Sequence, residues 1–114
     1  MTVTTVVTRV LQGLRDSGGL KSIDVANVLE VSPATVSRWS TGKAAPHPKT
    51  QRLISDLRYV VDRLAEIYTK DEIREWLYAR NQLLEGERAI DLIHDGRTEE
   101  ILAVIERLDA GAYL

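Results

Sequence analysis

The chain has 114 residues, the size of one domain or two very small ones, and a chain of this length buries roughly 65% of its unfolded surface. It has no cysteine, no apolar run near the roughly 18 residues of a membrane span and no secretory signal, which excludes a disulfide framework and predicts a soluble, cytoplasmic protein with no membrane contact. Residues 1–60 carry a net charge of +4 and residues 61–114 carry −6, so the first half suits a polyanion, unless each charge set is merely a solvated face.

The first segment repeats apolar residues at helical spacing. These positions predict a helix that stops at Ser17-Gly18-Gly19. Val6 and Val7 break the alternation that a strand requires, although the many β-branched residues leave a strand as the weaker alternative. The expected inner face consists of Val3, Val6, Val7, Val10, Leu11 and Leu14.

Two short helices are predicted next. Ser22 is expected to cap the first, which runs for about two turns. Ser32 is expected to cap the second, with Pro33 at the first helical position, where the missing N–H of proline costs nothing. The apolar positions of the first short helix are Ile23, Val25, Ala26, Val28 and Leu29.

A longer helix is predicted to begin near Pro48. It carries an unbroken apolar stripe over roughly five turns, which can form either the core or a seam between two copies of the chain. Thr69 and Glu72 form a capping-box pattern for the following helix, in which Trp76 is expected to anchor the core before the helix breaks around Asn81. The stripe consists of Leu53, Ile54, Leu57, Val60, Val61, Leu64 and Ile67.

The last two predicted helices are bounded by glycines. Gly86 opens a short helix that closes at Asp95-Gly96, and Thr98 is expected to cap the final helix, which Gly111 ends. No stretch of the sequence is convincing as a strand. We therefore predict an all-α fold of about seven helices.

The span from Ser22 to Thr41 has the spacing of a helix-turn-helix. A DNA-reading helix must be braced by a partner helix, and Ala26 lies where only a small side chain lets the two helices cross closely. The pattern departs at Glu30, where such motifs usually place a glycine in a left-handed turn, so the turn is expected to differ slightly. The apolar residues expected between the two helices are Val25, Leu29, Val31, Val36 and Trp39.

Short polar side chains on the second of these helices let it enter the major groove of DNA. Arg38 can donate a bidentate pair of hydrogen bonds to guanine, and the cations that follow can hold phosphates together with the N-terminus of the long helix. The alternative is a helix-turn-helix kept for packing alone. The predicted groove-facing residues are Ser32, Ala34, Thr35, Ser37 and Arg38, and the predicted phosphate contacts are Lys43, Lys49 and Arg52, with His47 beside them.

Two stretches carry a family resemblance. The segment IDVANVLEVSPATVSRWSTGKAAP, residues 23–46, resembles the Xre-type helix-turn-helix of phage-like repressors. Residues 72–114 are similar to the toxin-binding domain of the Xre/MbcA/ParS antitoxin family, with Arg80 and Ala89 in place of two family prolines. This resemblance implies a DNA-binding domain over residues 1–68 and a toxin-binding domain over residues 69–114. The matching residues are Trp76, Leu77, Asn81, Leu84, Gly86, Asp91, Leu92, Ile93, Gly96, Ile101, Val104, Ile105 and Leu108.

The resemblance also implies a function. Family members neutralise a co-encoded RES-domain toxin that consumes NAD, repress their own operon together with the toxin, and commonly form homodimers within a larger complex. Their C-terminal end approaches or enters the NAD pocket of the toxin. Carried over to this chain, toxin binding falls on Asp109, Gly111, Ala112, Tyr113 and Leu114.

The chemistry of this C-terminal end suits such a role. Tyr113 has an apolar ring with a polar tip, and together with Leu114 it can fill a nucleotide pocket. The alternative is a disordered or self-packed tail, which is the usual state of terminal residues.

Two other classes of protein are weighed against the antitoxin. An enzyme is disfavoured because His47 and His94 lie in different segments and the sequence shows no nucleophile with a base, no phosphate-binding glycine loop and no metal-ligand cluster. We therefore predict no catalytic, cofactor-binding or metal-binding residue. A free-standing Xre-family repressor, whose second half dimerises it or senses a ligand, is the main alternative.

Overall fold

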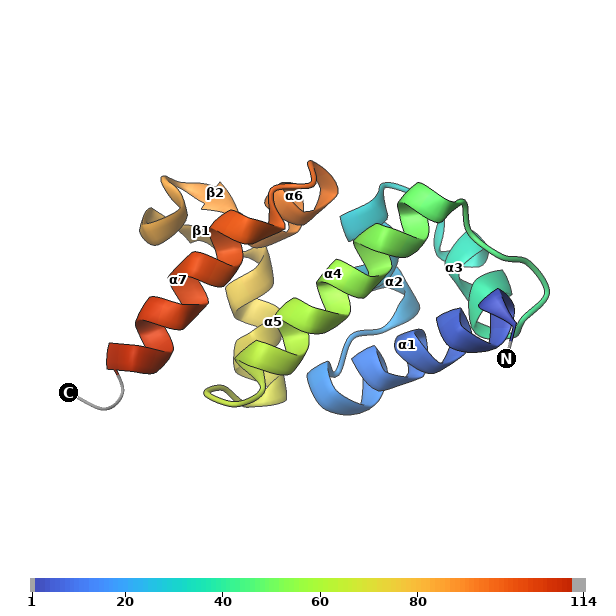
Figure 1. Ribbon diagram of the computed structural model, residues 1–114, viewed down its shortest axis with the longest axis horizontal. Helices are drawn as coiled ribbons and strands as arrows, with labels where there is room; N and C mark the ends of the chain where they lie inside the picture. The colour runs from blue at the N-terminus through green and yellow to red at the C-terminus, as the bar shows by residue number, and fades with distance from the viewer. Residues whose placement is uncertain (1, 112–114) are drawn as a thin grey trace.

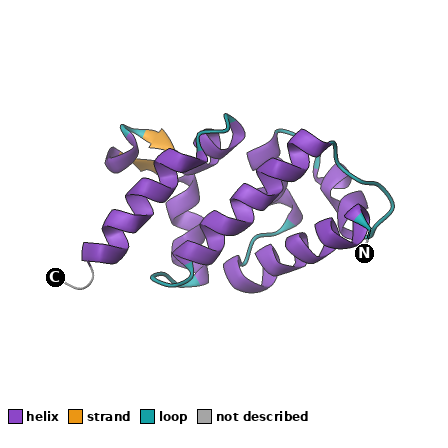
Figure 2. Cartoon of the chain, viewed as in Figure 1, coloured by secondary structure: helices purple, strands orange, loops and turns teal. Residues whose placement is uncertain are grey.

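A computed structural model describes residues 2–111 of the chain, and this range contains seven α-helices (Figures 1 and 2). The predicted all-α fold of about seven helices is therefore confirmed. The helices are α1 (Val3–Gly18), α2 (Ser22–Leu29), α3 (Pro33–Ser40), α4 (Pro48–Leu64), α5 (Lys70–Tyr78), α6 (Ala89–His94) and α7 (Thr98–Gly111).

A small β-hairpin lies between α5 and α6, where the sequence predicted no strand. β1 (Arg80–Asn81) pairs antiparallel with β2 (Glu87–Arg88), and the one-turn 3₁₀ helix η1 (Gln82–Leu84) joins them. Each strand is only two residues long, so no alternation of polar and apolar residues can announce it. The prediction was wrong in this detail because tertiary packing, and not a local pattern, forms the hairpin.

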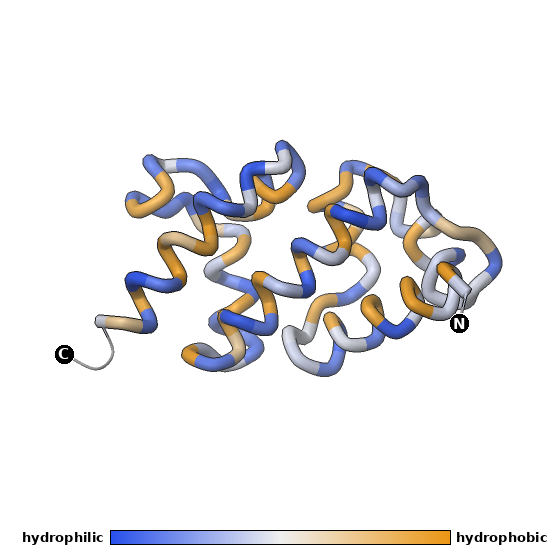
Figure 3. The backbone as a smooth tube through the Cα atoms, in the orientation of Figure 1, coloured by the Kyte–Doolittle hydropathy of each residue, from blue (hydrophilic) through white to orange (hydrophobic). Residues whose placement is uncertain are grey.

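Helix α4 is the central element of the fold. It lies beside α1 along one part of its length and beside α7 along another, and in Figure 3 hydrophobic and hydrophilic residues alternate along these helices. Its apolar stripe packs against both the first and the second half of the chain. The stripe therefore does not form a seam between copies, because Ile54, Leu57, Val60, Val61 and Leu64 are all buried in this chain's own core.

Helix α1 buries only part of its predicted apolar face. Val7, Leu11 and Leu14 are buried, whereas Val3 and Val6 are 51% and 45% exposed. Val3 and Val6 instead border an open hollow between α1 and α4, which Gln51, Ile54 and Ser55 also line. The prediction of the inner face was right for the later turns of the helix and wrong for these two valines.

Two of the four predicted N-caps are correct. Ser32 accepts a hydrogen bond from the Thr35 amide at 3.2 Å, and Thr69 accepts one from the Glu72 amide at 3.3 Å. Ser22 is instead the first residue inside α2, whose N-cap is Lys21. Thr98 is likewise inside α7, and its buried hydroxyl donates to Asp56 at 3.1 Å.

The two halves of the chain share one hydrophobic core. Helix α5 packs on α1, α6 packs on α2 and α4, and α7 packs on α4 (Figure 1). The cluster of buried side chains extends from residue 7 to residue 105 without a break at residue 68. The functional boundary between residues 1–68 and 69–114 stays a prediction.

Candidate DNA-binding and toxin-binding surfaces

Helices α2 and α3 form the predicted helix-turn-helix. Val25, Leu29, Val36 and Trp39 are buried at their contact, Ala26 is 2% exposed, and Val31 is half-buried. Helix α1 braces α3 from behind, since the Thr8 hydroxyl donates to the Trp39 carbonyl at 3.2 Å. The outer face of α3 therefore does not pack against the rest of the described chain.

The turn between α2 and α3 adopts the left-handed conformation in spite of Glu30. This residue has φ 57° and ψ 46°, and its amide donates to the Ala26 carbonyl, as does the amide of Val31 at 3.1 Å. A non-glycine residue in this region costs roughly 1 kcal/mol. The backbone therefore follows the same path as a glycine turn. The turn differs from the usual one only in the side chain of Glu30 and in the strain of a non-glycine residue in this conformation.

The predicted groove-facing residues lie together on one face of α3. Ser32, Ala34, Ser37 and Arg38 are exposed and Thr35 is half-buried. The Thr35 hydroxyl lies 2.8 Å from the Ser32 hydroxyl and accepts a hydrogen bond from Arg38 at 3.4 Å. The Arg38 guanidinium is thus held near the start of the helix, at the end that enters the major groove in helix-turn-helix proteins.

The predicted phosphate contacts lie in the loop after α3 and at the start of α4. Lys43, Lys49 and Arg52 are exposed, and within residues 2–111 none of the three forms an ion pair with a carboxylate. Cations without an ion-pair partner can replace the counterions of a polyanion. Arg52 also borders a hollow lined by Asp56, Thr98 and Glu99, so it lies toward α7, and the role of these residues in DNA binding stays a prediction.

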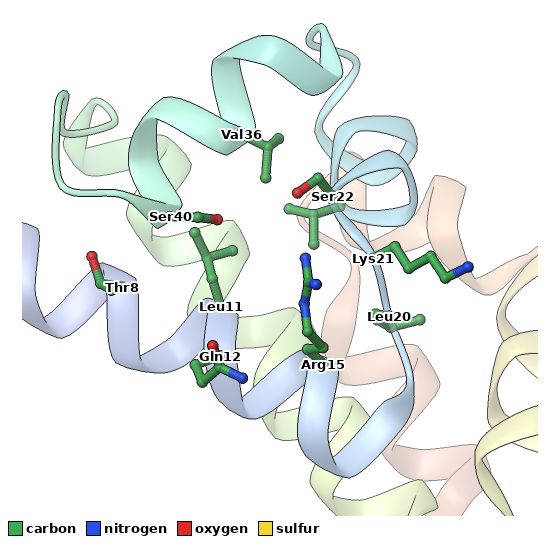
Figure 4. A pocket seen from close by; sticks show the side chains of 10 residues that line it. Thr8, Leu11, Gln12, Arg15, Leu20, Lys21, Ser22, Val36 and Ser40 are labelled. Carbon is green, nitrogen blue, oxygen red and sulfur yellow. The ribbon is translucent and has the colours of Figure 1, made fainter.

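A small hollow lies where α1, α2 and α3 meet. Figure 4 shows Arg15, Gln12 and Ser40 among the side chains around it, and its volume of about 60 Å³ holds one or two water molecules. A ligand pocket usually has a volume of roughly 300–1,000 Å³. This hollow is therefore too small to be the sensor site of a ligand-controlled repressor.

Four of the seven cations of residues 61–114 form ion pairs with carboxylates of the described residues. The pairs of Arg74, Arg88 and Arg97 are 3.0 Å or shorter, whereas the contacts of Arg63 are 3.6 and 3.7 Å. This half therefore shows its surplus of carboxylates to solvent. The pairs are Arg63 with Glu66 and Asp109, Arg74 with Asp24, Arg88 with Asp91, and Arg97 with Glu87 and Glu100.

A buried carboxylate joins the helix-turn-helix to the acidic half. Asp24 is 1% exposed and accepts hydrogen bonds from Arg74 at 3.0 and 3.2 Å, from the Tyr78 hydroxyl at 2.7 Å and from the Lys21 amide at 2.9 Å. Asn27 in turn donates to the Tyr78 oxygen at 2.9 Å. Burial by itself raises the pKa of Asp24, but these donors more than offset it and hold the pKa below its ordinary value.

A second polar contact joins the turn to α6. His94, in the last turn of α6, places Nε2 2.6 Å from the Glu30 carboxylate and Nδ1 3.0 Å from the Val28 carbonyl. Sequence reasoning missed both this contact and the role of Asp24. The one available signal was an acidic residue among the apolar positions of α2, and its partners lie about 50 or more residues away in the chain.

The predicted toxin-binding residues lie at the end of α7. Asp109 is half-buried, with its carboxylate 3.7 Å from Arg63, and Gly111 is exposed as the last residue of the helix. Ala112, Tyr113 and Leu114 lie outside the described residues. Trp76 is half-buried and packs against the core, in agreement with the expected anchoring role.

Among residues 2–111 no group of three or more histidine, aspartate and glutamate side chains could hold a metal ion. In the same range, no helix is both long enough and apolar enough to span a bilayer.

Comparison with known proteins identifies the family. No protein-family model matches the chain. The mycobacterial cidal antitoxin MbcA of Mycobacterium tuberculosis is 30% identical over 109 residues, which cover 96% of each protein. The probable mycobacterial cidal antitoxin Rv3188 of M. tuberculosis is 36% identical over 96 residues, covering 84% of this chain and 82% of its own. A chain in the crystal structure of the M. tuberculosis MbcT–MbcA toxin–antitoxin complex matches with a TM-score of 0.82 at 30% identity, over 96% of this chain and 98% of that chain. The chain therefore belongs to the family of the mycobacterial cidal antitoxin MbcA.

Proposed function

We propose that this antitoxin-family chain binds and inhibits a RES-domain toxin that consumes NAD, and that it represses its own operon by binding operator DNA. The observation that carries the proposal is the structural match to a chain of a toxin–antitoxin complex, since the match spans both halves of this chain. A match confined to the helix-turn-helix would support no more than a DNA-binding protein.

The DNA-binding part of the proposal rests on the surface around α3. Exposed Ser32, Ser37 and Arg38 read base edges, and the unpaired cations Lys43 and Lys49 contact phosphates on either side. Two copies of the chain, as a homodimer, would present two reading helices to the two half-sites of an operator.

The toxin-binding part rests on the acidic half. Helix α7 ends at an exposed Gly111, beyond which Tyr113 and Leu114 supply an aromatic ring with a polar tip and an aliphatic side chain. These groups suit a pocket built for a nucleotide, and their insertion would exclude NAD. The exposed carboxylates Glu99 and Glu106 would favour approach to a positively charged rim of the toxin.

The test separates the two parts of the proposal. The chain is co-expressed with the RES-domain protein encoded beside it, and cell growth and NAD content are measured. Deletion of residues 111–114 should abolish protection from NAD loss while leaving binding to upstream DNA largely intact. Arg38→Ala should weaken DNA binding by about 1 to 3 kcal/mol while leaving protection intact.

Each variant serves as the control for the other. Full protection by the truncated chain would refute occlusion of the NAD pocket by the C-terminal end. If no neighbouring RES-domain protein is encoded, or if the intact chain fails to protect against it, the chain acts instead as a free-standing repressor.

A further inference from the structure

The turn of the helix-turn-helix is stabilised by a residue of the other half of the chain. We define the His94 bridge as the His94 ring, the Val28 carbonyl 3.0 Å from Nδ1 and the Glu30 carboxylate 2.6 Å from Nε2. Both partners are acceptors, so each ring nitrogen donates to its partner when it carries a proton. Val28 and Glu30 lie at the end of α2, directly before the turn into α3.

Glu30 needs such support because of its backbone conformation. At φ 57° it occupies a region that glycine enters freely and that other residues rarely adopt. Backbone bonds from the Glu30 and Val31 amides to the Ala26 carbonyl hold the main chain, while the Glu30 side chain is 67% exposed and, among the described residues, its carboxylate is bound by His94. The His94 ring therefore stabilises a left-handed turn that glutamate, unlike glycine, does not favour.

The conformation of this turn decides where α3 lies. Only Val31 and the capping residue Ser32 separate Glu30 from the first helical residue of α3, so a change in the Glu30 dihedral angles tilts the whole reading face. A shift of about 1 Å at a recognition helix is enough to break bidentate contacts to bases.

We propose that His94 is a positioning residue for the DNA-reading helix, which it holds through the left-handed Glu30 turn. This inference rests on the proposed operator binding and adds that the DNA-reading geometry depends on α6 in the acidic half. It implies that residues 1–68 alone do not present α3 correctly.

Glycine at position 30 provides a decisive test, since glycine adopts the turn without support. Binding of the full-length protein to duplex DNA from upstream of its own coding region is measured by fluorescence anisotropy at fixed salt. We expect His94→Ala and Glu30→Ala each to weaken binding about five- to tenfold. Glu30→Gly should bind like the native chain, and adding Glu30→Gly to His94→Ala should restore affinity to within about twofold of native.

Asp95→Ala is the matched control, because Asp95 is the next residue along, is exposed and makes no hydrogen bond to α2 within the described part of the chain. It should bind within about twofold of native. The proposal is overturned if His94→Ala binds DNA normally, or if Glu30→Gly fails to rescue it, since a merely structural role of His94 would not be rescued by a glycine in the turn.

Amide hydrogen exchange gives a reading that does not depend on DNA. The Val31 amide, bonded to the Ala26 carbonyl at 3.1 Å, should exchange at least fivefold faster in His94→Ala and return to the native rate in the double variant. If the native chain binds no upstream DNA, the proposed operator binding fails, and the exchange rates still decide whether His94 positions the turn. Unchanged exchange in His94→Ala would refute it.

Discussion

Replacement of Asp24 by asparagine should destabilise the fold strongly, although the two side chains have nearly the same shape. The carboxylate accepts four hydrogen bonds, from Lys21, Tyr78 and twice from Arg74. Asparagine carries no charge and offers one acceptor oxygen, so its amide group must face donors on one side or the other.

The magnitude follows from the partners. A hydrogen bond to a charged group contributes roughly 1.5–3 kcal/mol and a neutral one about 1, so each bond loses on the order of 0.5–2 kcal/mol. Arg74 is 54% exposed and can turn to water, so its two bonds count at the low end. We expect the free energy of unfolding to fall by about 2 to 5 kcal/mol at pH 7.

The assay is urea unfolding followed by tryptophan fluorescence, which reports on the buried Trp39. The folded-state pKa of Asp24 is depressed, so its contribution is fully present above its ordinary value of 3.8 and is lost as the pH falls through the folded pKa. The difference between native protein and Asp24→Asn should stay constant from pH 7 to about pH 5 and shrink below about pH 4.

Asp16→Asn is the matched control, since Asp16 is exposed and accepts only from Gln12 in its own helix, at 3.0 Å. It should change the free energy of unfolding by less than about 0.5 kcal/mol. A loss of that size in Asp24→Asn, or a larger loss that persists unchanged at pH 3, would show that the buried carboxylate does not stabilise the fold through its charge.

Three other changes test separate parts of the structure. Gly18→Ala should lower the free energy of unfolding by about 1 to 3 kcal/mol, because the new Cβ would lie 2.5 Å from a Val61 methyl. Gly13→Ala should change it by less than about 0.5 kcal/mol, because the new Cβ meets only the flexible end of Arg58. Equal losses in urea unfolding would contradict this packing argument. Thr69→Ala should cost about 1 kcal/mol by removing the cap of α5, and a Tm equal to that of the native chain would show that the cap contributes nothing. Lys49→Ala should reduce the slope of log binding constant against log salt by about one for upstream DNA; an unchanged slope would remove Lys49 from the phosphate contacts.

Much of the fold could be predicted because its signals are local. Ser32 followed by Pro33 marks the start of α3, and Thr69 with Glu72 marks the start of α5, because each cap needs only residues within one turn. The helix-turn-helix spacing placed the exposed face of α3 correctly for the same reason. Local signals failed at Ser22 and Thr98, where hydroxyls suited to capping lie one residue inside their helices.

The sequence by itself determined the all-α class, the paired helices α2 and α3 and the separation of basic and acidic halves. Only the tertiary structure decided how the halves are joined. The carboxylate of Asp24 meets Arg74 across 50 residues, and His94 meets Val28 across 66, at the end of α2. No periodicity records such contacts, because they depend on how helices pack in space. The same packing places His94 beside Glu30, a poor residue for a left-handed turn.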